Sequence, residues 1–150
     1  MELSDLYSER ILDLAGNAVS PARLDHPDAS ARKVSRVCGS SIEVDLIMRD
    51  GVISGYGHDI SACALGQTSA AVVAREIVGT PVTEFLAVRT AMHDMLKAGG
   101  PPPTGKWDDL KYLQPVRDYP NRHVSTLLVF DAVAAALAEV ESKQAVAAGR

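Results

Sequence analysis

The fold is decided by the stretch Ser41-Ile42-Glu43-Val44-Asp45-Leu46-Ile47-Met48-Arg49-Asp50-Gly51-Val52-Ile53. Its first half alternates apolar and polar residues, which is the period of a half-buried antiparallel strand. Asp50-Gly51 is a strong hairpin signal, because both central positions of a tight two-residue turn need left-handed backbone. We therefore expect a small meander of three antiparallel strands near 33–39, 40–49 and 52–60.

Helical periodicity surrounds this meander. Leu3, Tyr7, Ile11 and Leu14 predict a first helix behind a Ser4 cap, ended by Gly16-Asn17. The segment from Val19 to Arg32 is rich in turn residues and has no apolar period, which favours a mobile surface linker that packs little.

The second half of the chain is expected to be mostly helical. The predicted elements are helices over 65–77 and 82–96, an exposed Gly/Pro loop at 99–105, a short helical turn near 108–113 and a buried helix over about 122–143. The fold class is therefore α+β: one domain over residues 1–150, with a three-stranded antiparallel sheet packed against several helices.

Composition excludes several classes of protein. With 150 residues, 47% of them hydrophobic and 23% charged, the chain suits one globular domain. A net charge of -4 offers no basic field for nucleic acid. The start lacks the basic and apolar regions of a secretory signal, and we expect no run of about 20 apolar residues that crosses a membrane. We therefore expect a cytoplasmic protein without nucleic-acid or membrane partners.

The two cysteines carry the clearest chemistry in the sequence. Cys38 falls at a turn between strands, and Cys63 falls where the third strand gives way to a helix. Backbone N–H groups at a helix start favour the thiolate, the form that binds metals and attacks sulfur. Burial as a small apolar residue is the equal alternative from spacing alone. The common nucleotide-binding, serine-hydrolase and zincin motifs are absent, which excludes those classes of enzyme.

At these residues the sequence resembles the U-type iron–sulfur cluster assembly scaffolds, namely IscU, SufU and the N-terminal part of NifU. The resemblance is closest to the SufU branch and covers most of the chain. It rests on Leu6-Tyr7 with Ile11-Leu12-Asp13, Val37-Cys38-Gly39-Ser40-Ser41-Ile42, Ile60-Ser61-Ala62-Cys63 followed by Ser69, the segment Leu113–Arg122, and the Pro/Gly loop before that segment. It implies a SufE/NifU-like fold and a role in cluster assembly as a binding protein rather than an enzyme.

The resemblance also implies a set of ligands for a cluster or metal ion, and two positions of this sequence depart from that set. The family holds a nascent cluster or a zinc ion with three cysteines and an aspartate. Cys38 and Cys63 carry over, but the third cysteine falls on Ser125 and the aspartate falls on Ser40. A serine hydroxyl is a hard, weakly acidic donor, whereas clusters and zinc select soft thiolates. The predicted site is therefore incomplete.

Several groups are candidates to complete the site. His123, two residues before Ser125, is the leading candidate for an added metal ligand, and His58 is a weaker one. An external thiol or a second copy of the chain is the other source of ligands, so self-association is part of the hypothesis. The implied partners are a cysteine desulfurase or other assembly proteins. Two further functions stay open: a degenerate paralogue that docks such a partner without metal, and a zinc-dependent sulfur acceptor.

The fold makes two geometric predictions about these residues. Cys38 and Cys63 should lie close together, because the strands between them return the chain to the same sheet end. Ser125 should lie at the start of the last helix, within ligand reach of both cysteines.

Overall fold

A computed structural model describes residues 7–17, 20–36 and 39–147. Its four strands form one antiparallel sheet in the order β1-β2-β3-β4. They are β1 (Ala29–Ser35), β2 (Ser40–Arg49), β3 (Val52–Ser61) and β4 (Thr80–Pro81). The predicted α+β class is confirmed, and the short β4, which pairs with the start of β3, is an addition to the three strands that the sequence predicted.

The predicted hairpin joins β2 to β3. Asp50 has φ of 52° and Gly51 has φ of 77°, the two left-handed positions that a tight turn of this kind requires. The turn pairs Arg49 with Val52 and Met48 with Ile53, and the register then shifts by one residue between Ile47 and Met48. Because of this shift, Val44 lies opposite His58 and Leu46 lies opposite Tyr56. The alternating apolar side chains of β2 are thereby turned into the core.

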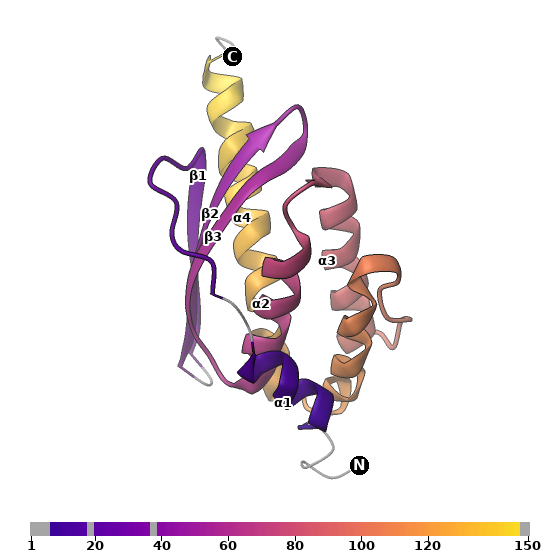
Figure 1. Ribbon diagram of the computed structural model, residues 1–150. Coiled ribbons are helices and arrows are strands. Elements are labelled where there is room, and N and C mark those ends of the chain that lie inside the picture. Colours follow the sequence, from indigo (N-terminus) through magenta and orange to yellow (C-terminus); the bar gives the residue numbers. More distant parts are fainter. Residues whose placement is uncertain (1–6, 18–19, 37–38, 148–150) are drawn as a thin grey trace.

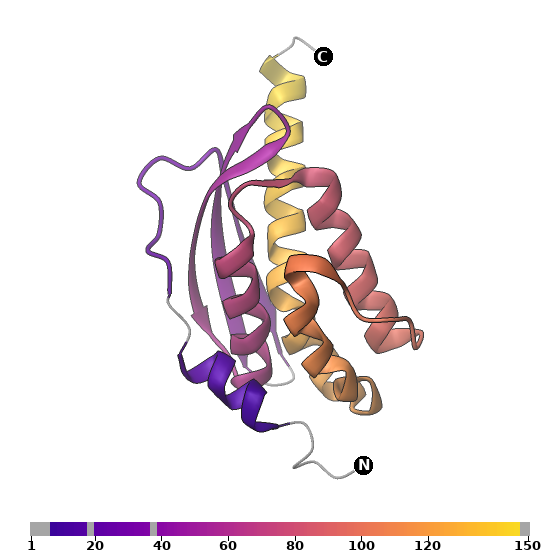
Figure 2. The same ribbon diagram turned by 45° about the vertical axis from the view of Figure 1, so that its right-hand side comes forward.

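The helices cover one face of the sheet, as Figures 1 and 2 show. Four are α-helices: α1 (Glu9–Gly16), α2 (Ala64–Glu76), α3 (Val82–Lys97) and α4 (His123–Ala147). Two 3-10 segments, η2 (Gly105–Asp118) and η3 (Pro120–Arg122), connect α3 to α4. The short helical turn predicted near 108–113 is therefore longer than expected, because Trp107, Leu110, Leu113 and Val116 bury a continuous apolar side.

Helix α4 forms the centre of the molecule, between the sheet and helix α3, with α2 beside it. The helical stretch Pro120–Gln144 contains a window with a mean hydropathy of 1.6 and is long and apolar enough to cross a membrane by length and composition, so the expectation that no such stretch exists was wrong. However, 67% of the apolar window is buried inside the protein. The apolar character of α4 is therefore that of a core helix.

Residues 20–28, which we call the strap, correct the prediction of a loosely packed linker. The carbonyl of Pro21 accepts a hydrogen bond from the backbone N–H of His58, at 3.3 Å. The Arg23 guanidinium forms an ion pair with Asp45, whose side chain is fully buried. A Cβ on Gly57 would collide with the carbonyl of Ala22, so the strap lies directly against β3. Residues 29–32, also assigned to the linker, belong to strand β1.

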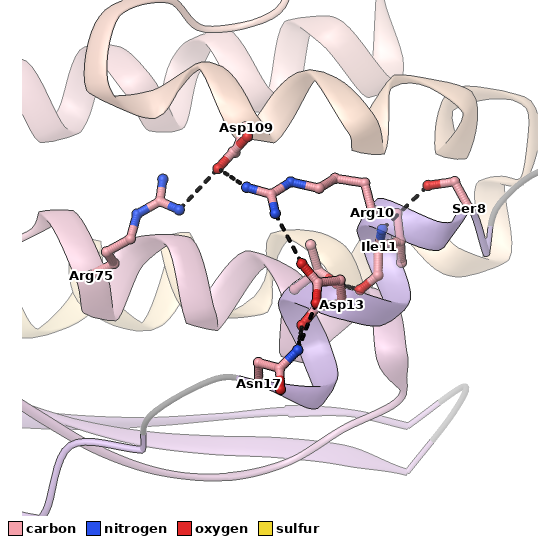
Figure 3. Close-up of polar contacts among 8 residues, drawn as sticks. Ser8, Arg10, Ile11, Asp13, Asn17, Arg75 and Asp109 are labelled. Carbon is pink, nitrogen blue, oxygen red and sulfur yellow. Dashed lines mark hydrogen bonds and ion pairs between the residues drawn. The ribbon is translucent and has the colours of Figure 1, made fainter.

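Helix α1 begins later than the sequence predicted and is held by charges. Its cap is Ser8, whose hydroxyl accepts from the backbone N–H of Ile11, whereas Ser4 lies outside the described residues. Asp109 of η2 accepts from Arg10 of α1 at 3.0 Å and from Arg75 of α2 at 2.9 Å (Figure 3). One carboxylate therefore joins three elements around the short N-terminal helix.

Candidate functional site

The candidate site lies at the end of the molecule where β3 ends and both α2 and α4 begin, at the bottom of Figures 1 and 2. The start of β2 supplies Ser40, the N-cap of α2 supplies Cys63, and the first turn of α4 supplies Ser125. Three residues that are far apart in sequence thus meet at one sheet end. Ser125 lies at the start of the last helix within reach of Cys63, whereas its predicted closeness to Cys38 lies outside the described residues.

The three side chains form a short hydrogen-bonded row. The Cys63 Sγ lies 3.2 Å from the Ser125 Oγ, and the Ser125 Oγ lies 3.3 Å from the Ser40 Oγ. Both serines are buried, at 2% and 1% exposure, whereas Cys63 is only partly buried. The thiol is therefore the member of the row that solvent or another protein reaches first.

Gly66 forms the floor beneath this row and was missed by the sequence analysis. A Cβ at this position would lie 2.9 Å from the Cβ of Ala62 and 3.1 Å from the Ser125 Oγ. Helix α2 can approach α4 this closely only because residue 66 has no side chain. A glycine inside a helix costs stability relative to alanine, so its presence in the first turn of α2 was the available signal of close packing.

His123, the proposed extra ligand, is tied to the backbone. Its Nε2 lies 3.0 Å from the carbonyl oxygen of Val116 and 3.2 Å from that of Arg117. Carbonyls only accept hydrogen bonds, so Nε2 carries a hydrogen and the neutral ring has only Nδ1 left to offer a metal. The ring holds the end of η2 against the start of α4, and its role as a ligand stays a prediction.

His58, the weaker candidate for a metal ligand, contacts Tyr56 and the strap. Its Nδ1 lies 2.8 Å from the hydroxyl of Tyr56, and its Nε2 lies 3.5 Å from the hydroxyl of Ser20 in the strap. Burial lowers the pKa of His58 below its usual value, partly opposed by the charge of Asp59. The residue therefore belongs to the contact between the strap and β3.

The donors that the structure describes around Cys63 do not by themselves make a metal cage. Among residues 7–17, 20–36 and 39–147, no three His, Cys, Asp or Glu side chains are grouped so that they could hold a metal ion. The described row supplies one thiol and two hydroxyls, a poor match to the thiolates that zinc and iron–sulfur clusters select. Cys38 lies outside the described residues, and so does its predicted closeness to Cys63.

Solved structures of other proteins share this fold. The crystal structure of the N-terminal part of a nitrogen-fixing NifU-like protein from Brucella abortus matches with a TM-score of 0.91 and 49% identity, over 94% of this chain and 98% of that one. A putative iron–sulfur cluster assembly scaffold protein for the SUF system from Fervidobacterium islandicum AW-1 matches with a TM-score of 0.81 and 20% identity, over 91% and 99% of the two chains. A hypothetical protein solved at 2.3 Å matches with a TM-score of 0.76 and 19% identity, over 89% and 98%.

Fold, site position and identity together define a U-type scaffold domain. The 49% identity over nearly the whole chain shows that this protein belongs to the family of NifU-like N-terminal domains, which confirms the family resemblance. The other two structures support the fold alone, because their identities are near 20%. No family model and no curated protein matches the sequence.

Proposed function

We propose that this protein works in iron–sulfur cluster assembly as a cytoplasmic U-type scaffold, a binding protein and not an enzyme. Family membership supports the general role. The observation that carries the proposal is the meeting of Cys63, Ser125 and Ser40 at one end of the fold, the positions that the family resemblance assigns to the site. A nascent cluster, or the iron and sulfur from which it is built, is the cargo.

Ser40 and Ser125, which replace two ligands of the family, determine how strongly the protein binds this cargo. The whole chain has two cysteines, and a cluster that is fully ligated by thiolates needs four. Two hydroxyls in the row do not replace the missing soft ligands at neutral pH. We infer that one chain holds its cargo weakly, and that tight retention requires an external thiol or the cysteines of a second copy.

A cysteine desulfurase is the partner that this role requires, because sulfur for a cluster has to be delivered by another protein. The family resemblance implies a partner of this class. Cys63, partly exposed at the end of the molecule, is the described thiol that a sulfur donor can reach.

The hydrogen bond between Ser40 and Ser125 favours a second candidate function. Because the two buried hydroxyls bond to each other, the positions next to Cys63 are satisfied without a metal. This suits a paralogue that docks an assembly partner and holds no cargo. The zinc-dependent sulfur acceptor is the weakest candidate, since the third cysteine position of the family is a hydroxyl here.

The test is the iron, zinc and acid-labile sulfide content of the protein after it is incubated without oxygen with ferrous iron, cysteine, a cysteine desulfurase and dithiothreitol, the thiol that reduces the desulfurase's persulfide sulfur to sulfide. Iron and sulfide in equal amounts, lost in Cys63→Ala and kept in the distant control Ser54→Ala, support the scaffold. Zinc alone supports the sulfur acceptor. Neither metal nor sulfide, together with a stable complex with the desulfurase, supports the docking protein.

A further inference from the structure

A hollow of about 410 Å³ lies between the tip of the β2–β3 hairpin, the start of α3 and the C-terminal half of α4. Figures 1 and 2 show these three parts at the top of the molecule, whereas Cys63, at the start of α2, lies at the bottom. The volume is within the usual range of binding sites for small molecules. The hollow is therefore separate from the candidate site and is not used in the proposed function.

The walls of the hollow are mostly apolar. The apolar side chains that line it include Met48, Val82, Leu86, Leu137 and Val140. Met48 packs against the core, so its side chain lies on the α4 side of the sheet. Leu86 is 38% exposed, which leaves apolar surface of this large side chain in contact with water. A ligand that covers this surface gains affinity from its burial.

Hydrogen bonds hold the walls of the hollow in place. The backbone N–H of Val82 donates to the carbonyl of Gly51 at 2.9 Å, which joins the start of α3 to the hairpin tip. Asp28 joins the other two walls, because its carboxylate accepts from the backbone N–H of Met48 at 2.7 Å and its carbonyl accepts from the Lys143 ammonium at 2.9 Å. The hollow is thus formed before any ligand binds, which reduces the cost of ordering it.

The charges in the lining are negative. Asp50 and Glu141 belong to it, and the described residues that line it include no Lys or Arg. Within the part of the chain that the structure describes, neither carboxylate forms an ion pair: Lys143 pairs with Glu139 at 3.1 Å, and Arg49 belongs to the face of the sheet away from the core. Uncompensated negative charge therefore stands beside exposed apolar surface.

We propose that this hollow binds a small organic cation, namely a molecule with an apolar body and a protonated amine. The apolar body lies between α3, α4 and the hairpin, and the amine lies at the carboxylates of Asp50 and Glu141. Burial of the apolar body supplies affinity, and the two negative charges select a cation over a neutral or anionic molecule of the same shape. The site adds a binding activity to the protein and does not rest on the proposed function.

The test uses three probes that share one apolar body, namely 4-phenylbutylamine, 4-phenylbutanol and 4-phenylbutanoate. Backbone amide shifts of the full chain in NMR titrations measure each dissociation constant and locate the probe. We expect the amine to bind at about 1 mM, as suits a molecule of this size, with shifts at the residues that line the hollow. The alcohol should bind about fivefold more weakly and the acid more weakly still, because each lacks the attraction to the carboxylates.

Two variants test the charges and the space separately. Asp50→Asn with Glu141→Gln should give the amine and the alcohol equal affinity, and asparagine tolerates the left-handed backbone of residue 50. Ala138→Leu puts a larger side chain at the rim of the hollow and should weaken binding of the amine about tenfold. The matched control is Ala87→Leu, an exposed alanine of α3 outside the lining, which should bind the amine as the wild type does. Circular dichroism of each variant checks that it is folded.

Each contrary outcome overturns a stated part of the proposal. Equal affinity of the wild type for the amine, the alcohol and the acid overturns the role of the carboxylates. Absence of binding, or shifts that lie away from the lining, overturns the site itself, and so does equal binding by Ala138→Leu and Ala87→Leu. If a lysine–phenylalanine–lysine peptide causes shifts in the lining and the amine causes none, the occupant is a segment of a protein and not a small molecule.

Discussion

The molecule contains two buried polar clusters of opposite character. Around Asp45, a fully buried carboxylate accepts hydrogen bonds from the Arg23 guanidinium, the backbone N–H of Leu24 at 3.0 Å and the Ser30 hydroxyl at 2.6 Å. Around Ser125, a hydroxyl lies between another hydroxyl and a thiol at 3.3 and 3.2 Å. The first cluster is charged and fully matched, whereas the second is neutral and its hydroxyl–hydroxyl contact is long.

The difference between the two clusters indicates a structural role for one and a functional role for the other. A buried carboxylate is tolerated only when charged donors surround it, so the Asp45 cluster has one favourable arrangement and fixes the strap. The neutral row at Cys63 has little to lose when its partners change, because long hydrogen bonds between neutral groups contribute modestly. We therefore assign the Asp45 cluster to stability and the Cys63 row to the exchange of partners.

Breaking the Asp45 cluster should give the largest effect. Arg23→Met leaves a buried carboxylate without its cation, and we expect a loss of about 3 kcal/mol in the free energy of unfolding. Arg49→Met, at the exposed end of β2, is the control and should change little. Urea unfolding of both variants at neutral pH measures the difference. Equal stability of the two variants contradicts the assigned role of the cluster.

The same variant changes the response to acid. The Arg23 hydrogen bond lowers the pKa of Asp45 from 3.8 to about 2. Because the folded pKa is the lower one, the stability that this group contributes is present above pH 3.8 and is lost as the pH falls from 3.8 towards 2. Urea unfolding between pH 5 and 2, at about half-unit steps, should show this loss in the wild type and a flatter profile in Arg23→Met.

Filling the floor of the Cys63 row should have the next largest effect. Gly66→Ala places a Cβ 3.1 Å from the Ser125 Oγ, so either α2 shifts away from α4 or Ser125 leaves Cys63. We expect a loss of about 1–3 kcal/mol, the usual cost of overpacking. Gly16→Ala is the control, because its Cβ meets no atom within 4 Å. Thermal unfolding checks the pair, and a Gly66→Ala variant as stable as Gly16→Ala would show that the row is not tightly packed.

Releasing α1 tests a third, more exposed polar cluster. Asp109→Asn removes the charge that joins Arg10 to Arg75, and we expect a loss of about 1 kcal/mol because both guanidinium groups are partly exposed. Amide exchange over residues 9–16 should become faster, whereas the neighbouring exposed control Asp108→Asn should leave it unchanged. Unchanged protection of α1 in Asp109→Asn shows that Ile11 packing alone holds the helix.

The smallest expected effect concerns His58. Since burial lowers its pKa in the folded state, the protein should lose stability as the pH falls below 6.5, the ordinary value for histidine. His58→Gln should flatten the stability profile between pH 7 and about 5, the range where an unperturbed histidine titrates. The control Ser54→Ala, which changes an exposed residue of β3 without a titrating group, should keep the slope. A slope that is the same in His58→Gln and the wild type contradicts a role for this residue in holding the strap.

The sequence predicted those features of the fold that depend on residues close together in the chain. The hairpin was predicted because alternation and the Asp50-Gly51 pair act over a few residues. The place of Ser125 beside Cys63 came from the family resemblance, since no spacing rule links positions 62 residues apart.

The features that the sequence did not predict depend on contacts between residues that are far apart in the chain. The strap looked like a linker because its turn-rich residues have no period, and its fixation depends on Asp45 in a later strand. Asp45 itself looked like the polar face of a strand. The role of Gly66 depends on the approach of α4, which the sequence of α2 alone does not show.

The most direct test of the central claim restores the family's ligands. In Ser125→Cys with Ser40→Asp, a thiol and a carboxylate stand beside Cys63, and zinc or cluster affinity should rise by at least about a hundredfold over the wild type. The measurement is competition for zinc against a chelator of known affinity, with Ser54→Ala as control. Our account predicts that the wild type loses zinc readily and that the double variant retains it. Equal retention by both proteins shows that the natural site is already complete and contradicts the account.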